Sequence, residues 1–452
     1  MIFKKILKNI LKLDKRTLLI KKNTIGSFGL KLIVVALDFF IVPLTLSYLT
    51  QTNYGIWLTI NSMIRWFNLF DLGISHGYRN KLSIALANDD LLMAKKLTST
   101  AYGIIGVLCI VLVGMSILIV PMINWNWVLN TDTISDHQLT SIVQIVLGCF
   151  SITLVLKILT SIFLAKQMPF YTKLYETIAK IVTFGGIFIL VYCTKEDLFL
   201  YVGLVSVIPL LILLGFNLFF FNKSYHSIKP SFKTFEKHLI NDIMGLGIKF
   251  FFIQLGATML FMTDNLIITN LFSAAEVTPY EISKKYFSLI LVVFAIIIQP
   301  YWSAITEAYH RNDLDWIRKS MKSLIRIWKI IALASLILLA LFYPFLEIWV
   351  GNKVEVSLAL AIQWTLFVIL QTNNNIYTFF LNGTGKVSIQ LMTGIVSFFI
   401  NIPLSIFFAK YLGMGSTGVL LATNCSILIY IFTRQIQYHK IIDNKAYGIW
   451  NK

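Results

Sequence analysis

Charged residues are scarce in this 452-residue sequence: they make up 13% of it, whereas apolar residues make up 57%. Soluble domains contain about 25% charged and about 45–50% apolar residues, so this composition excludes an ordinary soluble domain. The long apolar stretches also lack the alternation of apolar and polar residues that a transmembrane β-barrel needs. The mean hydropathy of +0.76 therefore indicates an α-helical membrane protein.

Cysteine is equally rare, and its positions exclude several kinds of site. The four cysteines all fall within apolar stretches (Cys109, Cys149, Cys193 and Cys425). We interpret them as small buried hydrophobic residues rather than as disulfide partners or metal ligands. A nucleotide-driven pump is disfavoured as well, because Gly383-Thr384-Gly385-Lys386 lacks the upstream glycine of a P-loop at the right spacing. We expect neither a metal nor a cofactor.

The first 24 residues lack the continuous apolar core and the small-residue cleavage site of a signal peptide. Instead, apolar residues recur at helical spacing among lysines, beginning with Phe3, Lys4 and Lys5. This pattern predicts a basic amphipathic helix that lies on the anionic cytoplasmic leaflet. A disordered basic tail is the alternative.

Apolar stretches of about 20 residues, the length that crosses a bilayer as a helix, recur along the rest of the chain. They predict an all-α polytopic membrane protein with about twelve transmembrane helices. The expected spans are residues 27–49, 53–74, 98–120, 141–164, 175–193, 198–221, 244–271, 281–305, 327–349, 358–381, 388–409 and 417–437.

The positive charges decide the orientation of these spans. The N-terminal segment carries eight Lys and Arg residues, and the even-numbered connections and the C-terminal tail carry nineteen more, Arg434 among them. The odd-numbered connections carry only Lys195, Lys353 and Lys410. Because cytoplasmic loops are enriched in Lys and Arg, both termini are expected in the cytoplasm. The formal net charge of +18 then reflects topology rather than nucleic-acid binding.

Two short matches indicate an internal duplication. Gly29-Leu30-Lys31 opens the first span, and Gly247-Ile248-Lys249 opens the seventh. The segment Asn88–Lys95 matches Asn312–Lys319, with Asn-Asp at the start and a lysine seven residues after the asparagine. Six spans per half would insert both halves in the same direction. The expected organisation is an amphipathic segment (1–24), an N-lobe with helices 1–6 (25–221), a basic cytoplasmic linker (222–243), a C-lobe with helices 7–12 (244–437) and a cytoplasmic tail (438–452).

Ionisable and amide side chains concentrate in spans 1, 2, 7, 8 and 10. An ionised group at the bilayer centre costs about 2.5–3.5 kcal/mol, so such groups need a partner or a wet cavity. Lys31, Asp38 and Thr45 are seven residues apart, which places them on one helix face. A central hydrated cavity between the lobes would explain the set, whereas hydrogen bonds between helices are the alternative.

Four further segments carry a resemblance to a known family. They are Tyr54-Gly55-Ile56-Trp57, Phe70-Asp71-Leu72-Gly73 with Gly77 and Asn80, Asn88-Asp89 with Lys95–Ala101, and Leu381–Lys386. The sequence resembles the O-antigen flippases, polysaccharide transporters of the multidrug/oligosaccharidyl-lipid/polysaccharide exporter superfamily. The resemblance implies two six-helix lobes that alternate between inward-open and outward-open states. It also implies transport of a glycan on polyprenyl pyrophosphate across the bacterial inner membrane, with no catalysis.

The polar residues then receive expected roles. A central cationic cavity would bind the anionic diphosphate through Lys31, Arg65, Lys249 and Lys285. Its polar lining would include Asn61, Asn68, Gln254, Gln299, Asn374 and Asn375, which suit sugar hydroxyls. Candidates for coupling to H⁺ or Na⁺ are Asp38, Asp71, Asp264 and Glu307. Asp71 is equally compatible with capping the end of span 2.

Two other functions remain open at this point. A membrane glycan polymerase or glycosyltransferase is the alternative from the enzyme class, since Asp313-Leu314-Asp315 has a form that can bind a metal–nucleotide sugar. This motif is short and also typical of a solvated turn. A drug/cation antiporter of the same superfamily is the other alternative. The sequence names neither the glycan nor the coupling ion nor the oligomeric state.

Overall fold

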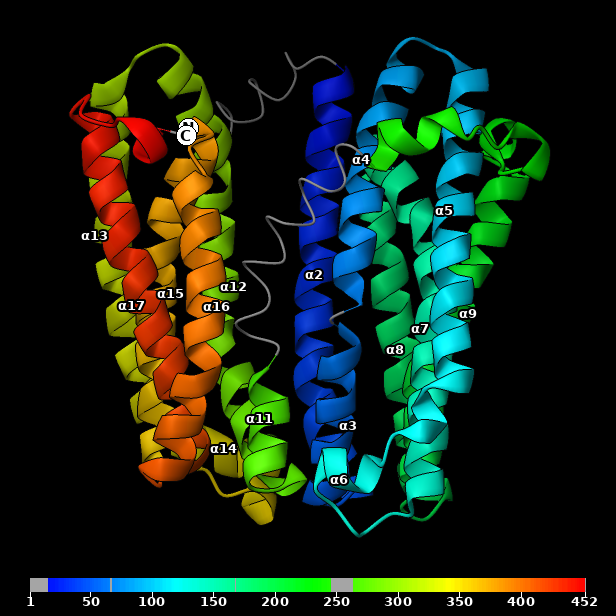
Figure 1. Cartoon of the computed structure of the whole chain (residues 1–452), viewed down its shortest axis with the longest axis vertical. Coiled ribbons are helices and arrows are strands. Elements are labelled where there is room, and N and C mark those ends of the chain that lie inside the picture. Colours follow the sequence, from blue (N-terminus) through cyan, green and yellow to red (C-terminus); the bar gives the residue numbers. More distant parts are fainter. Residues whose placement is uncertain (1–14, 66, 167, 245–262, 452) are drawn as a thin grey trace, which may run out of the picture. The chain divides into compact units, whose positions relative to one another are not determined.

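The computed structural model describes residues 15–65, 67–166, 168–244 and 263–451. Within these ranges the regular secondary structure is helical and no β-strand occurs, which confirms the all-α fold (Figure 1). Eight of the described helices are long and apolar enough to cross a membrane. They are Gly29–Tyr48, Leu91–Met122, Asp136–Ala165, Pro169–Cys193, Leu198–Asn222, Leu314–Ala340, Ser388–Tyr411 and Gly415–Ile442. The expected total of twelve stays a prediction.

The helices cluster into two compact units. Unit 1 contains the described residues up to Leu49, Phe67–Trp125 and the residues from Ile134 to 244. Its helices are α2 (Lys15–Tyr48), α4 (Asn68–Ala87), α5 (Leu91–Leu118), α7 (Asp136–Ala165), α8 (Pro169–Cys193) and α9 (Leu198–Asn222). Helix α7 contacts α4, α5, α8 and α9, and α2 packs along α8.

The core of unit 1 lies between α4, α5, α7 and α9. Leu82, Ile105, Leu154 and Phe163 are each fully buried there. The ring of Phe163 meets that of Phe220 edge to face, with 4.8 Å between ring centroids. The outer faces of these helices expose large apolar side chains, as expected for helices that face lipid.

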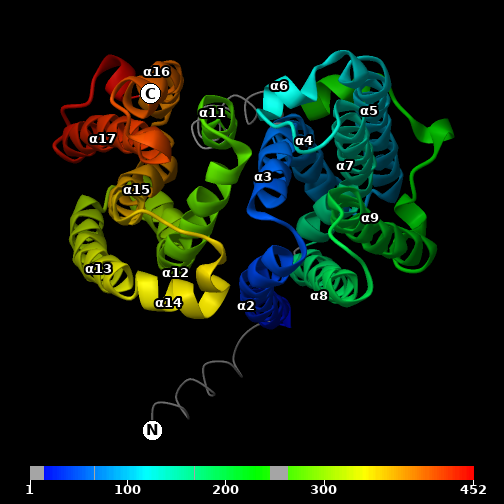
Figure 2. The same ribbon diagram turned by 90° about the horizontal axis from the view of Figure 1, so that it is seen from below.

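Unit 2 contains the remaining described residues. Its helices are α3 (Gln51–Arg65), α11 (Asp264–Leu271), α12 (Val277–His310), α13 (Leu314–Ala340), α14 (Phe342–Val350), α15 (Leu358–Thr384), α16 (Ser388–Ile406) and α17 (Gly415–Ile442). The division of the chain falls within the short helix α6 (Trp125–Leu129), since Trp125 belongs to unit 1 and Asn126–Thr133 to unit 2. A π-helical turn, Phe407–Tyr411, continues α16. Helix α15 occupies the middle of this unit and contacts α12, α13 and α17 (Figure 2).

The two units repeat one turn geometry. Asp89 and Asn312 both have positive φ angles, 54° and 58°, which asparagine and aspartate tolerate better than most residues. The next residues, Asp90 and Asp313, cap α5 and α13 by accepting a bond from the backbone N–H three residues later. The structural equivalence is therefore Asp89 with Asn312. It differs by one residue from the expected alignment, which paired Asn88 with Asn312.

Helix α3 differs from the expected organisation. The expected span 53–74 is divided, since α3 ends at Arg65 and α4 begins at Asn68. The structure also groups Thr50–Trp66 with unit 2, whereas residues 25–221 were expected to form one lobe. The reason is a close contact between α3 and the 3₁₀ segment η4 (Ala274–Glu276): Gln51 Nε2 donates to the carbonyl of Ala275 at 3.1 Å.

One buried contact extends this packing deeper along α3. The Thr59 and Thr269 hydroxyl oxygens are 2.8 Å apart, and both side chains are fully buried. Gly55 makes the approach possible, because a Cβ there would lie 1.7 Å from the carbonyl oxygen of Ala274. A glycine is therefore required on α3 at its contact with η4.

The described part of the chain begins in α2 and ends in a tail that packs onto unit 2. Helix α2 begins at Lys15, before the expected first span, and residues 1–14 of the expected amphipathic helix lie outside the described residues. At the other end, the tail folds back onto unit 2. Lys386 Nζ donates to the carbonyl of Asn451 at 2.8 Å, and the Lys440 ammonium lies 3.9 Å from the ring centre of Trp450.

Candidate functional site

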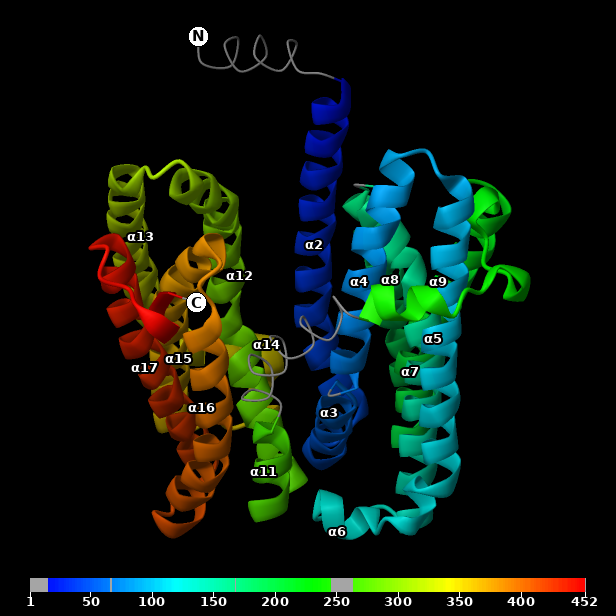
Figure 3. The same ribbon diagram turned by 45° about the horizontal axis from the view of Figure 1, so that its top comes forward.

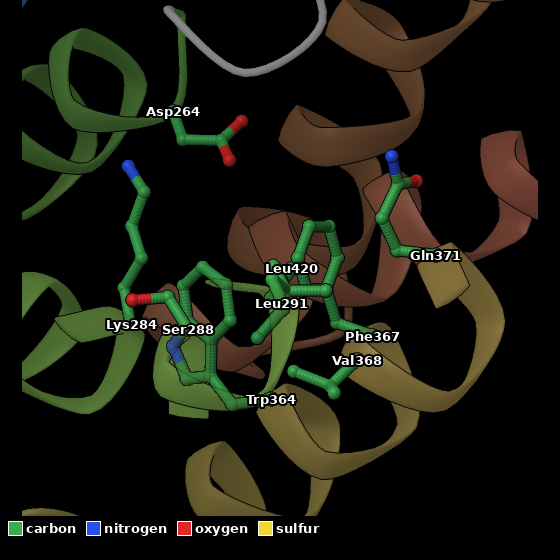
Figure 4. A pocket seen from close by; sticks show the side chains of 9 residues that line it. All are labelled: Asp264, Lys284, Ser288, Leu291, Trp364, Phe367, Val368, Gln371 and Leu420. Atoms are coloured by element: carbon green, nitrogen blue, oxygen red, sulfur yellow. The ribbon is translucent and has the colours of Figure 1, made fainter. Parts of the chain in front are cut away.

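A cavity of about 240 Å³ lies inside unit 2, between α11, α12, α15 and α17. Its polar lining consists of Asp264, Lys284, Ser288 and Gln371, and its apolar lining includes Trp364. Figure 4 shows Asp264 and Lys284 at one side of this space and Gln371 at the other. Ligand pockets typically measure about 300–1,000 Å³, so this cavity suits a small ion with water rather than an oligosaccharide.

Asp264 is the first residue of α11 and is almost completely buried. Its Oδ2 accepts a hydrogen bond of 2.6 Å from the hydroxyl of Tyr280, which is itself fully buried on α12. Its Oδ1 has no hydrogen-bond donor among the described residues, and the same holds for Asn265 Oδ1 and Thr263 Oγ1. Since an unpaired buried polar atom is costly, the Asp264 carboxylate can accept a proton, and the three oxygens together offer ligands to a cation.

The positive charge in this cavity belongs to a lysine that the sequence reasoning did not select. Lys284 Nζ donates to Glu281 Oε1 at 2.6 Å, one helical turn earlier on α12. The expected candidate was the next residue, Lys285, which is half-buried and not part of the cavity lining. The Glu281-Ile-Ser-Lys284-Lys285 sequence allows either lysine to reach the glutamate, so spacing alone could not distinguish them.

Helix α15 directs its polar residues in two directions. Gln371 lines the cavity and donates to Asn375 Oδ1 at 3.3 Å. Asn374 points instead to α17, where Arg434 Nη1 donates to its Oδ1 at 2.5 Å and to Thr378 Oγ1 at 2.6 Å. Asn374 is therefore held inside the unit, while Asn375 is half-buried on the side of Gln371.

Arg434 is a buried arginine with no carboxylate partner among the described residues. Its guanidinium lies 4.8 Å from the ring centre of Tyr430, and its Nε has no acceptor in the described part of the chain. The sequence reasoning counted it with the cytoplasmic charges because it lies near the end of α17. The helical spacing of Tyr430, Arg434 and Gln437 was the signal that could have placed it inside.

The expected polar face of α2 packs within unit 1. Asp38 Oδ1 forms an ion pair of 2.7 Å with Lys180 Nζ on α8, and both side chains are about one third exposed. Thr45 is buried, and its hydroxyl lies 3.2 Å from the hydroxyl of Tyr201 on α9. Asp38, one of the four candidates for ion coupling, thus has a cationic partner, whereas Asp264 Oδ1 has no donor among the described residues.

The remaining expected residues are spread over both units. Lys31 is half-buried in unit 1, and Asn61 is half-buried on α3 in unit 2. For Arg65, Asn68, Asp71, Gln299 and Glu307 the structure describes the helix but not the side chain, and Lys249 and Gln254 lie outside the described residues. The central cationic cavity therefore stays a prediction.

The Asp313-Leu314-Asp315 motif is used for helix capping. Asp313 Oδ1 accepts from the backbone N–H of Trp316 at 3.0 Å, and Asp315 Oδ1 pairs with Arg318 Nη1 at 2.9 Å. Within the described ranges, no cluster of three His, Cys, Asp or Glu residues is placed to hold a metal ion. The motif thus acts as a solvated turn.

Residues 20–306 match the polysaccharide biosynthesis protein family. The chain belongs to this family. It is 20% identical over 378 residues to the "Putative O-antigen export protein" of Yersinia pseudotuberculosis. The matched region covers 80% of this chain and 83% of the relative.

Solved structures show the fold. The inward-facing conformation of a multidrug resistance MATE family transporter of the MOP superfamily superposes with a TM-score of 0.73, 14% identity and coverage of 93% of this chain and 96% of that one. The lipid II flippase MurJ, in an inward closed conformation, superposes with a TM-score of 0.66, 15% identity and coverage of 92% and 87%. The chain is thus a multi-pass membrane protein with the fold of MOP-superfamily transporters.

Proposed function

We propose that this protein moves a polyprenyl-pyrophosphate-linked oligosaccharide from the cytoplasmic to the outer leaflet of the bacterial inner membrane, with both termini in the cytoplasm. Family membership and the similarity to an O-antigen export protein support the substrate class. The similarity to a lipid II flippase supports a lipid-linked substrate. Lys31, Arg65, Lys249 and Lys285 are the expected ligands of the diphosphate, because an anion of this charge density needs several cations.

The observation that carries the transport mechanism is the cavity beside Asp264. Transport without a nucleotide site needs an ion gradient or consumption of the product. A buried carboxylate with one oxygen free of donors in the described part can take up a proton or Na⁺, and occupancy then changes the charge inside unit 2. Asp264 is therefore our first candidate for coupling. Asp38 becomes the second candidate, because its ion pair with Lys180 already compensates its charge.

The coupling experiment uses the purified protein in proteoliposomes, with a polyprenyl pyrophosphate that carries a short fluorescent glycan as the probe. The wild type is expected to flip the probe faster when a pH or Na⁺ gradient is imposed. Asp264→Asn should flip the probe but lose this dependence, and Asp132→Asn, an exposed loop acid, should keep it. If Asp264→Asn keeps the full gradient dependence, the coupling role is wrong. If the wild type moves no probe, the substrate class is wrong.

A cation antiporter is the second candidate function, because a multidrug transporter is among the structures with the same fold. Deleting the gene separates the two functions. A flippase deletion is expected to accumulate a lipid-linked glycan on the cytoplasmic side, whereas an antiporter deletion should only increase sensitivity to lipophilic cations.

A further inference from the structure

The segment that follows α9, residues 223–244, is firmly attached to unit 1. Its inward side buries Tyr225, Ile228, Leu239 and Ile243 against the core of α4, α5, α7 and α9. Hydrogen bonds add to this attachment: the backbone N–H of Ser231 donates to Ser99 Oγ at 3.0 Å. The segment expected to be a basic cytoplasmic linker thus packs with unit 1 (Figure 3).

The acidic residues of the segment are used in the same attachment. Glu236 pairs with Lys96 of α5 at 2.8 Å, and Asp242 pairs with Lys81 of α4 at 3.2 Å. The lysines of the segment point away from this contact. All four are exposed (Lys223, Lys229, Lys233 and Lys237), so its outer side is basic.

An aromatic residue stands in the middle of this basic side. Phe232 has a relative exposure of 102%, so its ring touches almost nothing else in the protein. It begins the 3₁₀ segment η3 (Phe232–Thr234) and is followed directly by Lys233. A fully exposed phenyl ring gains free energy when an apolar phase covers it.

The depth of this ring follows from α5. Lys96 is the last charged residue of that helix, and residues 97–118 contain none. These residues span about 33 Å at 1.5 Å per residue, close to the roughly 30 Å thickness of the hydrocarbon core. The cytoplasmic boundary of the hydrocarbon therefore lies near the beginning of this stretch, around Ser99.

The segment docks at the same level of α5. Ser99 Oγ and Thr234 Oγ1 are 2.7 Å apart, and the ring of Phe235 covers Gly103, where a Cβ would lie 2.6 Å from Phe235 Cε2. Residues 231–236 thus lie between the headgroups and the acyl chains. Aromatic side chains and lysines are the residues that favour this zone, and anionic lipids attract the lysines.

We propose that the outer side of residues 223–237 is a binding surface for anionic phospholipids of the cytoplasmic leaflet, with Phe232 inserted below the headgroups and the four lysines among the phosphates. Because the segment is fixed to α4 and α5, this contact holds unit 1 at a defined depth in the membrane. The surface acts on lipid and is independent of the transported substrate.

The test measures the depth of residue 232 in the full-length protein. The four native cysteines are replaced by serine, and Phe232→Cys carries a nitroxide label in vesicles of neutral lipid with or without phosphatidylglycerol. Asn88→Cys, in the exposed turn between α4 and α5, is the aqueous control, and Ile110→Cys, in the middle of α5, is the hydrocarbon control. Accessibility to oxygen and to a water-soluble nickel complex gives the depth of each label.

The label at 232 is expected below the phosphates, between the two controls, and deeper with phosphatidylglycerol. Replacing the four lysines by glutamine should remove the effect of phosphatidylglycerol. Each lysine removed is expected to lower the affinity for anionic lipid about fivefold. A label at 232 as accessible to nickel as the label at 88, in both kinds of vesicle, would refute the proposal. So would a label that becomes protected only after soluble cell proteins are added, because the surface would then bind a protein.

Discussion

The contact between α3 and η4 can be tested by the substitution Gly55→Ala. The added Cβ would lie 1.7 Å from the carbonyl oxygen of Ala274 and 2.6 Å from the carbonyl carbon. Real Cβ contacts are not shorter than 3.0 Å, so the two backbones must separate by about 1.3 Å. Overpacking of this kind costs about 1–3 kcal/mol. This cost corresponds to about a 5- to 150-fold decrease in the fraction of molecules in which α3 contacts η4.

A disulfide reports that population directly. The Thr59 and Thr269 hydroxyl oxygens are 2.8 Å apart, so cysteines at both positions place their sulfurs near bonding distance in a background without native cysteines. Gly55→Ala is expected to slow the oxidation of this pair at least fivefold and to impair transport. The matched control is Gly106→Ala, whose added Cβ meets no atom within 4 Å. Equal oxidation rates for Gly55→Ala and the control would show that the contact does not need the glycine.

Three further predictions concern topology, a buried charge and an acid-sensitive attachment. A cysteine at Ser227 should be protected from an impermeant reagent in intact cells, whereas one at Glu355 should react; the reverse pattern would invert the topology. Arg434→Leu should lower the free energy of unfolding in detergent by about 1–3 kcal/mol, because it leaves Asn374 and Thr378 without their donor. Arg434→Lys should lower it less, and equal stability of all three proteins would contradict this. The Lys96 ammonium, which donates a hydrogen bond to Glu236, lowers the pKa of that carboxyl. Their contact therefore stabilises the attachment of the segment above the unfolded pKa of about 4.3, and this stabilisation is lost as the pH falls through the lower folded pKa. A fluorophore at Lys233→Cys should therefore report a change beside this ion pair only in strong acid, and Glu236→Gln should remove that transition.

The fold class was predictable because it follows from composition and from the length of apolar stretches, which are properties of the sequence alone. The duplicated turns were also predictable, since Asn and Asp at these positions reflect a local backbone requirement. Their register was shifted by one residue, because Asn88-Asp89 and Asp89-Asp90 offer the same residue types to the pattern. Only the φ angles of Asp89 and Asn312 decide between the two alignments.

The site was predictable as a set of residue types but not as a set of partners. Periodicity placed Lys31, Asp38 and Thr45 on one face of α2, yet it could not tell which neighbour that face meets. The partner of Asp38 is Lys180, which lies on α8. Tertiary packing decides such pairings, and one helix carries no information about the helix beside it.

The grouping of Thr50–Trp66 with unit 2 gives the chain the connectivity of a domain swap within one molecule. The polypeptide leaves unit 1 after Leu49, contributes α3 to the other unit and returns at Phe67. A protease cut in the segment that follows α9 would therefore not release two independent halves. The N-terminal fragment would keep α3, whose Gln51 and Thr59 remain bonded to Ala275 and Thr269 of the C-terminal fragment.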